Sequence, residues 1–159
     1  MLGTAGLIPF AAGAGATLYF SMLEPPNMWM AGEMLFLQMT YGATVLSFLG
    51  AAHWGFAGAN YSRSLQSSDP SAGTVSVNSS DTAWGRYIWG VVPQLLAWSS
   101  LTQHPTTGMV MLLSGFAGSF IADVIADRKG LVPAWYLKMR FPLTIGAMAF
   151  LGVTFVQML

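Results

Sequence analysis

Five long apolar stretches with few charged residues constrain this chain more than any other feature. They cover residues 3–23, 34–59, 87–101, 107–127 and 141–159. A helix needs roughly 20 residues to cross a hydrocarbon core about 30 Å thick. Only 8% of the 159 residues are charged, against about 25% in soluble domains. The sequence therefore predicts an all-α integral membrane bundle of five transmembrane helices, with residues 1–159 as a single domain.

The connections between these stretches differ in composition. Residues 60–86 are rich in Ser, Asn and Gly, which predicts an exposed polar loop. The residues before the last stretch mix aromatic side chains with cations, a composition typical of the headgroup level of a membrane. We expect a short interfacial segment there, formed by Trp135, Tyr136, Lys138 and Arg140.

The cations are distributed asymmetrically along the chain. Five spans place the second and fourth connections on one side of the membrane, and all six cations lie in them: Arg63, Arg86, Arg128, Lys129, Lys138 and Arg140. The first connection carries Glu24 and Glu33 but no cation. We call the side with the cations the positive side; by the positive-inside rule it faces the cytoplasm, mitochondrial matrix or stroma. The N-terminus is then predicted to lie inside and the C-terminus outside.

Small residues recur at four-residue spacing in two of the stretches, and small residues let helices approach closely in lipid. In the second stretch they are Ala43, Ser47, Ala51, Gly55 and Ala59, and in the fourth they are Ser114, Gly118, Ala122 and Ala126. We expect both stripes to be helix-packing faces. Whether the two stripes pack against each other stays open.

Several ionisable residues are expected at one depth, near the positive side. Ionisable groups within a membrane are energetically unfavourable unless they are paired. The sequence therefore predicts a structural polar layer made of His53, Arg86, Asp123, Asp127 and Arg128. We interpret this layer first as a clamp that fixes the order of the helices. The alternative interpretation is a proton or ion relay, or a ligand site.

The residue types present limit which cofactors and metals the chain could bind. The chain contains no cysteine, which excludes disulfides, thiolate metal sites and iron–sulfur clusters. His53 and His104 are expected on opposite sides of the membrane, so they cannot share a haem iron. His53 alone is a candidate ligand for the magnesium of a chlorophyll, and the Met-rich residues 22–34 superficially resemble a copper-uptake sequence. We expect bound lipid, no required cofactor and no metal site.

Four segments carry a resemblance to a known family. They are "YGATVLSFLGAAHWGFA" (41–57), "RYIWGVVPQLLAWSSL" (86–101), "GFAGSFIADVIADR" (115–128) and "PAWYLKMRFPLTI" (133–145). The chain resembles the small family of unknown function that includes mitochondrial transmembrane protein 69. The resemblance implies a five-helix membrane protein, found in bacteria and mitochondria, with no established activity and no catalytic residues to transfer. The motif positions are Tyr41, His53, Trp54, Arg86, Pro93, Trp98, Asp123, Asp127, Arg128, Trp135, Tyr136 and Arg140.

These observations favour a non-catalytic accessory subunit of a large bioenergetic complex in an organelle inner membrane. The respiratory chain of the mitochondrial inner membrane is the first choice, with other membrane subunits and lipids as partners. No nucleophile–base pair is apparent and the formal net charge is zero, so we expect neither an enzyme nor a nucleic-acid partner. The alternatives are a photosystem subunit in the thylakoid membrane, a small proton-coupled carrier or channel, and a complex assembly factor.

Overall fold

A computed structural model describes residues 2–58 and 79–158, except for the side chains of residues 2, 79–83 and 86. All regular structure within these ranges is helical. The helices are α1 (Leu2–Ala5), α2 (Ile8–Ser21), α3 (Met28–Gly58), α5 (Ser79–Ser100), α6 (Pro105–Arg128) and α7 (Ala134–Gln157). Among the described helices, α3, α6 and α7 are long and apolar enough to cross a membrane.

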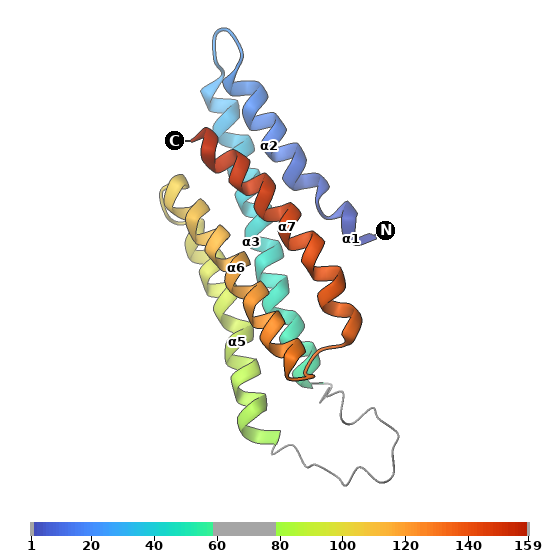
Figure 1. Cartoon of the computed structure of the whole chain (residues 1–159). Helices are drawn as coiled ribbons and strands as arrows, with labels where there is room; N and C mark the ends of the chain where they lie inside the picture. Colours follow the sequence, from blue (N-terminus) through green and yellow to red (C-terminus); the bar gives the residue numbers. More distant parts are fainter. Residues whose placement is uncertain (1, 59–78, 159) are drawn as a thin grey trace.

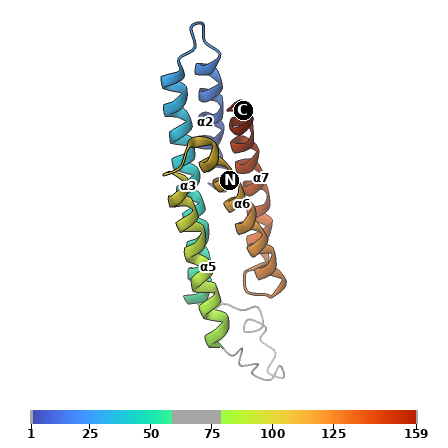
Figure 2. The ribbon, with the colours of Figure 1, turned by 90° about the vertical axis from the view of Figure 1, so that its left-hand side faces the viewer.

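Helix α3 is the organising element of the bundle. Its 31 residues correspond to a length of about 46 Å at 1.5 Å per residue. It packs against α2, α5 and α6, while α6 packs against α7 and α7 closes back onto α2. Figures 1 and 2 show the resulting elongated bundle, in which α2 accompanies α3 over only one half of its length. The other half of α3 lies beside α5, α6 and the first turns of α7.

The core is apolar and lies where α2, α3, α6 and α7 meet. Its most deeply buried large side chains are Phe10, Leu46, Met109, Leu112, Phe116 and Leu151, each at most 1% exposed. The outer surface is apolar as well, because large side chains such as Phe48, Trp98 and Val156 are about 70% exposed. An apolar outside around an apolar core is the pattern of a helix bundle with lipid as its solvent.

The predicted first span, residues 3–23, is not one helix. It is divided into the single turn α1 and the 14-residue α2, with Gly6 and Leu7 between them. At about 21 Å, α2 is shorter than a hydrocarbon core about 30 Å thick. The prediction counted apolar residues, and Pro9 at the start of α2 marks a helix beginning inside the apolar stretch.

Helices α3 and α5 each begin earlier than predicted. Helix α3 begins at Met28 rather than at residue 34, because the side chain of Asn27 accepts a hydrogen bond from the Met30 backbone N–H and caps the helix. Helix α5 begins at Ser79 rather than at residue 87, so its first two turns occupy part of the predicted loop 60–86. Polar composition alone suggested a loop there. The remainder of that loop, together with Arg63, lies outside the described residues.

The predicted interfacial residues 135–140 form the first turns of α7, and a tight turn joins this helix to α6. Gly130 adopts a left-handed backbone conformation with φ of 68°, and the Leu131 N–H donates to the Ala126 carbonyl, a combination that ends helices. Val132 is fully buried, and α7 begins directly after Pro133. Pro142 therefore lies inside α7 rather than near its start. Membrane helices tolerate an internal proline because neighbouring helices can satisfy the backbone groups that it leaves without a partner.

The two predicted small-residue stripes are buried only in part: Ala43 and Ala126 belong to the buried core clusters. Ala51 and Gly55 on α3 and Ser114 on α6 are exposed, and a Cβ added at Gly55 or Gly118 would meet no atom within 4 Å. Ala59 lies outside the described residues. The close approaches involve other small residues, at Gly50 against Gly90 of α5, at Gly108 against the Ser100 carbonyl, and at Gly115 against Leu46.

Substituting Gly50 should loosen the α3–α5 contact. A Cβ at this position would collide with the Gly90 carbonyl oxygen, and overpacking of this kind costs about 1–3 kcal/mol. We expect Gly50→Ala to lower the thermal unfolding temperature measured in detergent. Gly55→Ala, on the open face of the same helix, is the matched control and should leave that temperature unchanged or slightly higher, since alanine is the better helix former. Equal effects of the two substitutions would contradict the packing described here.

Candidate functional site

Three ionisable side chains from three helices meet inside the bundle. The Nε2 atom of His53 on α3 lies 2.9 Å from Oδ1 of Asp123 on α6. The Nε of Arg140 on α7 donates to the other carboxylate oxygen at 2.8 Å, and its Nη2 lies 2.6 Å from the same oxygen. We call His53, Asp123 and Arg140 the buried triad. In the sequence, Asp123 is 70 positions from His53 and 17 positions from Arg140.

The triad is almost completely removed from solvent. The side chains of His53, Asp123 and Arg140 are 6%, 1% and 5% exposed. A buried charge without a partner is strongly unfavourable, whereas a carboxylate held by a guanidinium and a ring nitrogen has both oxygens satisfied. The triad is five residues from the end of α3 and six from the start of α7, which corresponds to about 7–9 Å from that end of the bundle.

His53 and Trp54 are sequence neighbours that brace different helices. While His53 points toward α6 and α7, the Trp54 indole N–H donates to the Tyr87 carbonyl of α5 at 2.8 Å. The rings of Trp54 and Tyr87 meet edge to face, with centroids 6.2 Å apart. Gly90 leaves room for the indole, since a Cβ there would collide with the Trp54 ring. One turn of α3 therefore contacts all three helices around it.

The structure brings together only part of the predicted polar layer. His53 and Asp123 are in direct contact. Asp127 lies half-buried one turn farther along α6, and Arg128 is exposed at the end of that helix. The side chain of Arg86 lies outside the described residues. The cation that pairs with Asp123 is Arg140. The sequence pattern predicts this residue at the membrane interface instead.

The predicted interfacial residues divide between the two faces of α7. Trp135 and Lys138 are exposed, whereas Tyr136 and Arg140 are only 5% and 4% exposed. Tyr136, Arg140 and Thr144 follow one another at four-residue spacing, and all three are buried. This spacing was the available signal for an inward polar stripe. It was missed because α7 was expected to begin at residue 141, after two of the three residues.

The environment of His53 limits its use as a pigment or metal ligand. Its Nε2 atom is occupied by Asp123, so a metal would have to displace this contact or use Nδ1 on a buried ring. Within the described residues no group of three His, Cys, Asp or Glu side chains could hold a metal ion. His104, at the start of α6, is 19 residues from Asp123, a separation of about 28 Å along the helix. The two histidines are therefore far apart.

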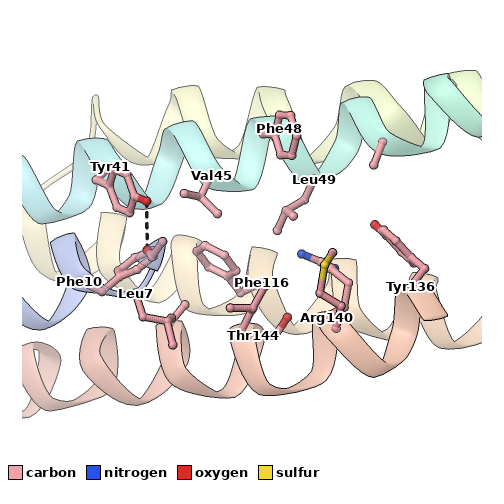
Figure 3. Close-up of a pocket in the computed structure, with 15 residues that line it drawn as sticks. Leu7, Phe10, Tyr41, Val45, Phe48, Leu49, Phe116, Tyr136, Arg140 and Thr144 are labelled. Carbon is pink, nitrogen blue, oxygen red and sulfur yellow. Dashed lines mark hydrogen bonds between the residues drawn. The ribbon is translucent and has the colours of Figure 1, made fainter. Parts of the chain in front are cut away.

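A cavity of about 260 Å³ adjoins the triad between α3 and α7. Arg140, Tyr136 and Thr144 line it from α7, and Tyr41, Phe48 and Leu49 line it from α3; Figure 3 shows these side chains around the open space. The Tyr41 hydroxyl donates to the Gly6 carbonyl at 3.0 Å and so closes one end. The cavity is therefore apolar over most of its length and polar at the end next to the triad.

A family model described as a protein of unknown function (DUF3429) matches residues 1–156 of the chain. The chain belongs to this family. As the sequence resemblance indicated, transmembrane protein 69 of Xenopus tropicalis is a relative, with 30% identity over 152 residues. That match covers 92% of this chain and 49% of the relative, so the chain spans about half the length of the curated relative that it matches. No solved structure matches the chain.

The family match and the apolar helices together identify this DUF3429 chain as a membrane protein. The name of the relative states that it crosses a membrane and says nothing of an activity. The role of the buried triad therefore has to follow from its geometry. Its most direct chemical capability is to hold α3, α6 and α7 together through charge-assisted hydrogen bonds in a medium of low dielectric constant.

Removing the charge of Asp123 should destabilise the bundle strongly. Asp123→Asn leaves the Arg140 guanidinium buried without its counter-charge, a change that typically costs about 3–5 kcal/mol. We expect a large fall in the unfolding temperature in detergent. Glu33→Gln, at an exposed position, is the control and should change stability by less than about 0.5 kcal/mol.

A double variant separates the pairing from a general effect of mutation. Asp123→Asn combined with Arg140→Met removes both charges, so it should recover part of the stability lost in Asp123→Asn alone. Strictly additive losses in the double variant would show that the two residues do not act as a pair.

Proposed function

We propose that this chain is a non-catalytic accessory subunit of a large multi-subunit bioenergetic complex in an organelle inner membrane. The respiratory chain of the mitochondrial inner membrane is the first candidate, with other membrane subunits and lipids as partners. The observation that carries the proposal is the apolar outer surface of the bundle. On α5 alone, Ile88, Leu95 and Trp98 are each more than half exposed. Such a surface can contact lipid and the helices of other membrane subunits.

The short connections support the same proposal. Within the described residues the connections between helices are residues 6–7, 22–27, 101–104 and 129–133. They offer little surface outside the membrane for binding a soluble partner. Among the described residues, the helix faces within the bilayer therefore offer most of the surface for contacts with other proteins, and close packing of side chains drives association there.

The buried triad supports a structural role over a carrier or channel. Both oxygens of Asp123 are already engaged, one by His53 and one by Arg140. A proton relay would have to break one of these contacts in each cycle, at the expense of a buried charge. As a brace, the triad instead holds three helices in a fixed order and gives the outer surface a constant shape for its partners.

We further propose five transmembrane segments, with the positive side facing the mitochondrial matrix. The exposed Arg128, Lys129 and Lys138 lie at the end of the bundle where α6 and α7 meet. Glu24 and Glu33 lie near the α2–α3 turn at the opposite end. This distribution of charge follows the positive-inside rule. The C-terminus is then in the intermembrane space, and the N-terminus, which lies about halfway along the bundle (Figure 1), is directed toward the matrix side.

Cysteine labelling tests this orientation without background, because the chain contains no cysteine. Thr102, Ala134 and Gln157 are exposed near helix ends, and each is replaced singly by cysteine. In mitoplasts, an impermeant maleimide should label Thr102→Cys and Gln157→Cys directly, and Ala134→Cys only after permeabilisation. Labelling of Ala134→Cys in intact mitoplasts, or of all three positions from one side, would overturn the proposed topology.

Native gel electrophoresis of gently solubilised membranes tests the accessory role. A stable subunit should comigrate with a mature respiratory complex and stay with it through a second, denaturing dimension. Migration only with small intermediates would indicate an assembly factor instead, and migration alone would rule out both. A variant with Trp98→Ala and Leu95→Ala on the exposed face of α5 should release the subunit if this face is the contact. The paired change Ile121→Ala and Ile125→Ala on the outer face of α6 is the comparison.

A further inference from the structure

We infer that the cavity beside the buried triad binds a neutral, ring-shaped carbonyl compound from the membrane, of the quinone type. The inference does not depend on the proposed accessory role. It rests on the shape of the cavity, on unpartnered polar atoms at one end of it, and on the charge of the triad.

The cavity exists because the N-terminal helices cover only half of the groove between α3 and α7. Helix α2 begins at Ile8, and Leu7 packs against Gly146 of α7. Toward the triad no N-terminal helix continues along the groove (Figure 1). Phe48 from α3 and Met139 from α7 line the cavity and are 72% and 43% exposed. The cavity therefore opens between these two helices toward the surrounding membrane.

Three polar groups at the triad end of the cavity have unused hydrogen-bonding capacity. The Thr144 Oγ1 is buried and makes no hydrogen bond with the described residues. The Tyr136 hydroxyl is buried and faces Asp123 without a well-directed hydrogen bond. The Nη2 of Arg140, although close to Asp123, makes no well-directed hydrogen bond. Figure 3 shows Tyr136, Arg140 and Thr144 along the same wall, beside the open space. Buried polar atoms are normally paired, so three at one end of a cavity indicate a missing partner.

The chemistry of these groups specifies an acceptor oxygen. A guanidinium can only donate, and the two hydroxyls can each donate a hydrogen bond. The charges of Asp123 and Arg140 cancel, so this ion pair offers donors without a net charge. A neutral carbonyl oxygen matches that combination better than a carboxylate, whose desolvation would need a net positive site.

The remaining lining specifies a flat, apolar body. Aromatic rings surround the cavity: Phe10, Tyr41, Phe48, Phe116 and Tyr136. Aromatic side chains pack favourably against the faces and edges of other rings. A cavity of about 260 Å³ is close to the lower limit of about 300 Å³ for small-molecule sites, which suits a single substituted ring whose tail leaves through the opening. A quinone ring with an alkyl tail meets each of these conditions.

Calorimetric titration of the full chain in lipid nanodiscs tests the inference, with decylubiquinone as the probe. We expect saturable binding at one site. Tyr136→Phe and Thr144→Val should each weaken binding about 3- to 10-fold, because each removes one neutral hydrogen bond. Tyr19→Phe and Thr44→Val change the same chemical groups at exposed positions and should bind as the unmodified chain does.

A second variant and two further probes keep the test decisive. Ala52 lines the cavity, so Ala52→Leu should abolish binding while the unliganded protein keeps its unfolding temperature. Decylbenzene, which has no oxygen, should bind at least tenfold more weakly than decylubiquinone. The inference is overturned by unsaturable partitioning of the quinone, by equal binding of decylbenzene, or by unchanged affinity in both Tyr136→Phe and Thr144→Val. Saturable binding of oleic acid in place of the quinone would likewise overturn it and assign the site to a carboxylate.

Discussion

The rest of the structure depends on the pairing of one buried carboxylate, that of Asp123, with a cation and a ring nitrogen. In a medium of low dielectric constant, Arg140 and His53 must lie within hydrogen-bond distance of Asp123, or the charge would be too unfavourable to bury. This requirement sets how α3, α6 and α7 are rotated about their own axes. Once the three are in place, Trp54 reaches α5 from the same turn of α3. One electrostatic condition thus determines the arrangement of one end of the bundle.

The opposite end is held by packing instead of charge. There α2 and α3 form an antiparallel pair, and the fully buried Phe10, Leu112 and Leu151 fill the space between helices. Gly108 allows α6 to approach the Ser100 carbonyl at the end of α5 there. The cavity lies between the apolar core at one end and the buried triad at the other. Its lining is therefore aromatic on one side and carries hydrogen-bond donors on the other.

The sequence predicted the helical class and the membrane setting correctly, and the family resemblance is confirmed. It was less reliable for helix boundaries. The cap at Asn27 and the left-handed Gly130 are single residues whose effect depends on local backbone geometry. The sequence predicts that the last helix begins at residue 141, whereas α7 begins at Ala134. Because of this difference, Arg140 was not expected inside the bundle. The small-residue stripes coincide with the buried faces only in part. Ala43 and Ala126 are buried, whereas Ala51 and Gly55 lie about half a turn from the packed face that contains Gly50 and His53.

The sequence by itself determined that this chain is a set of apolar helices, because hydropathy and length are properties of each segment alone. It also marked His53 and Asp123 as residues in need of partners, since isolated charges are unfavourable in lipid. Only the tertiary structure decided that Arg140 is that partner and that Tyr136 and Thr144 line a cavity. These outcomes depend on the rotation and vertical offset of each helix relative to its neighbours. Both quantities arise from all the contacts together, and no single segment of the sequence encodes them.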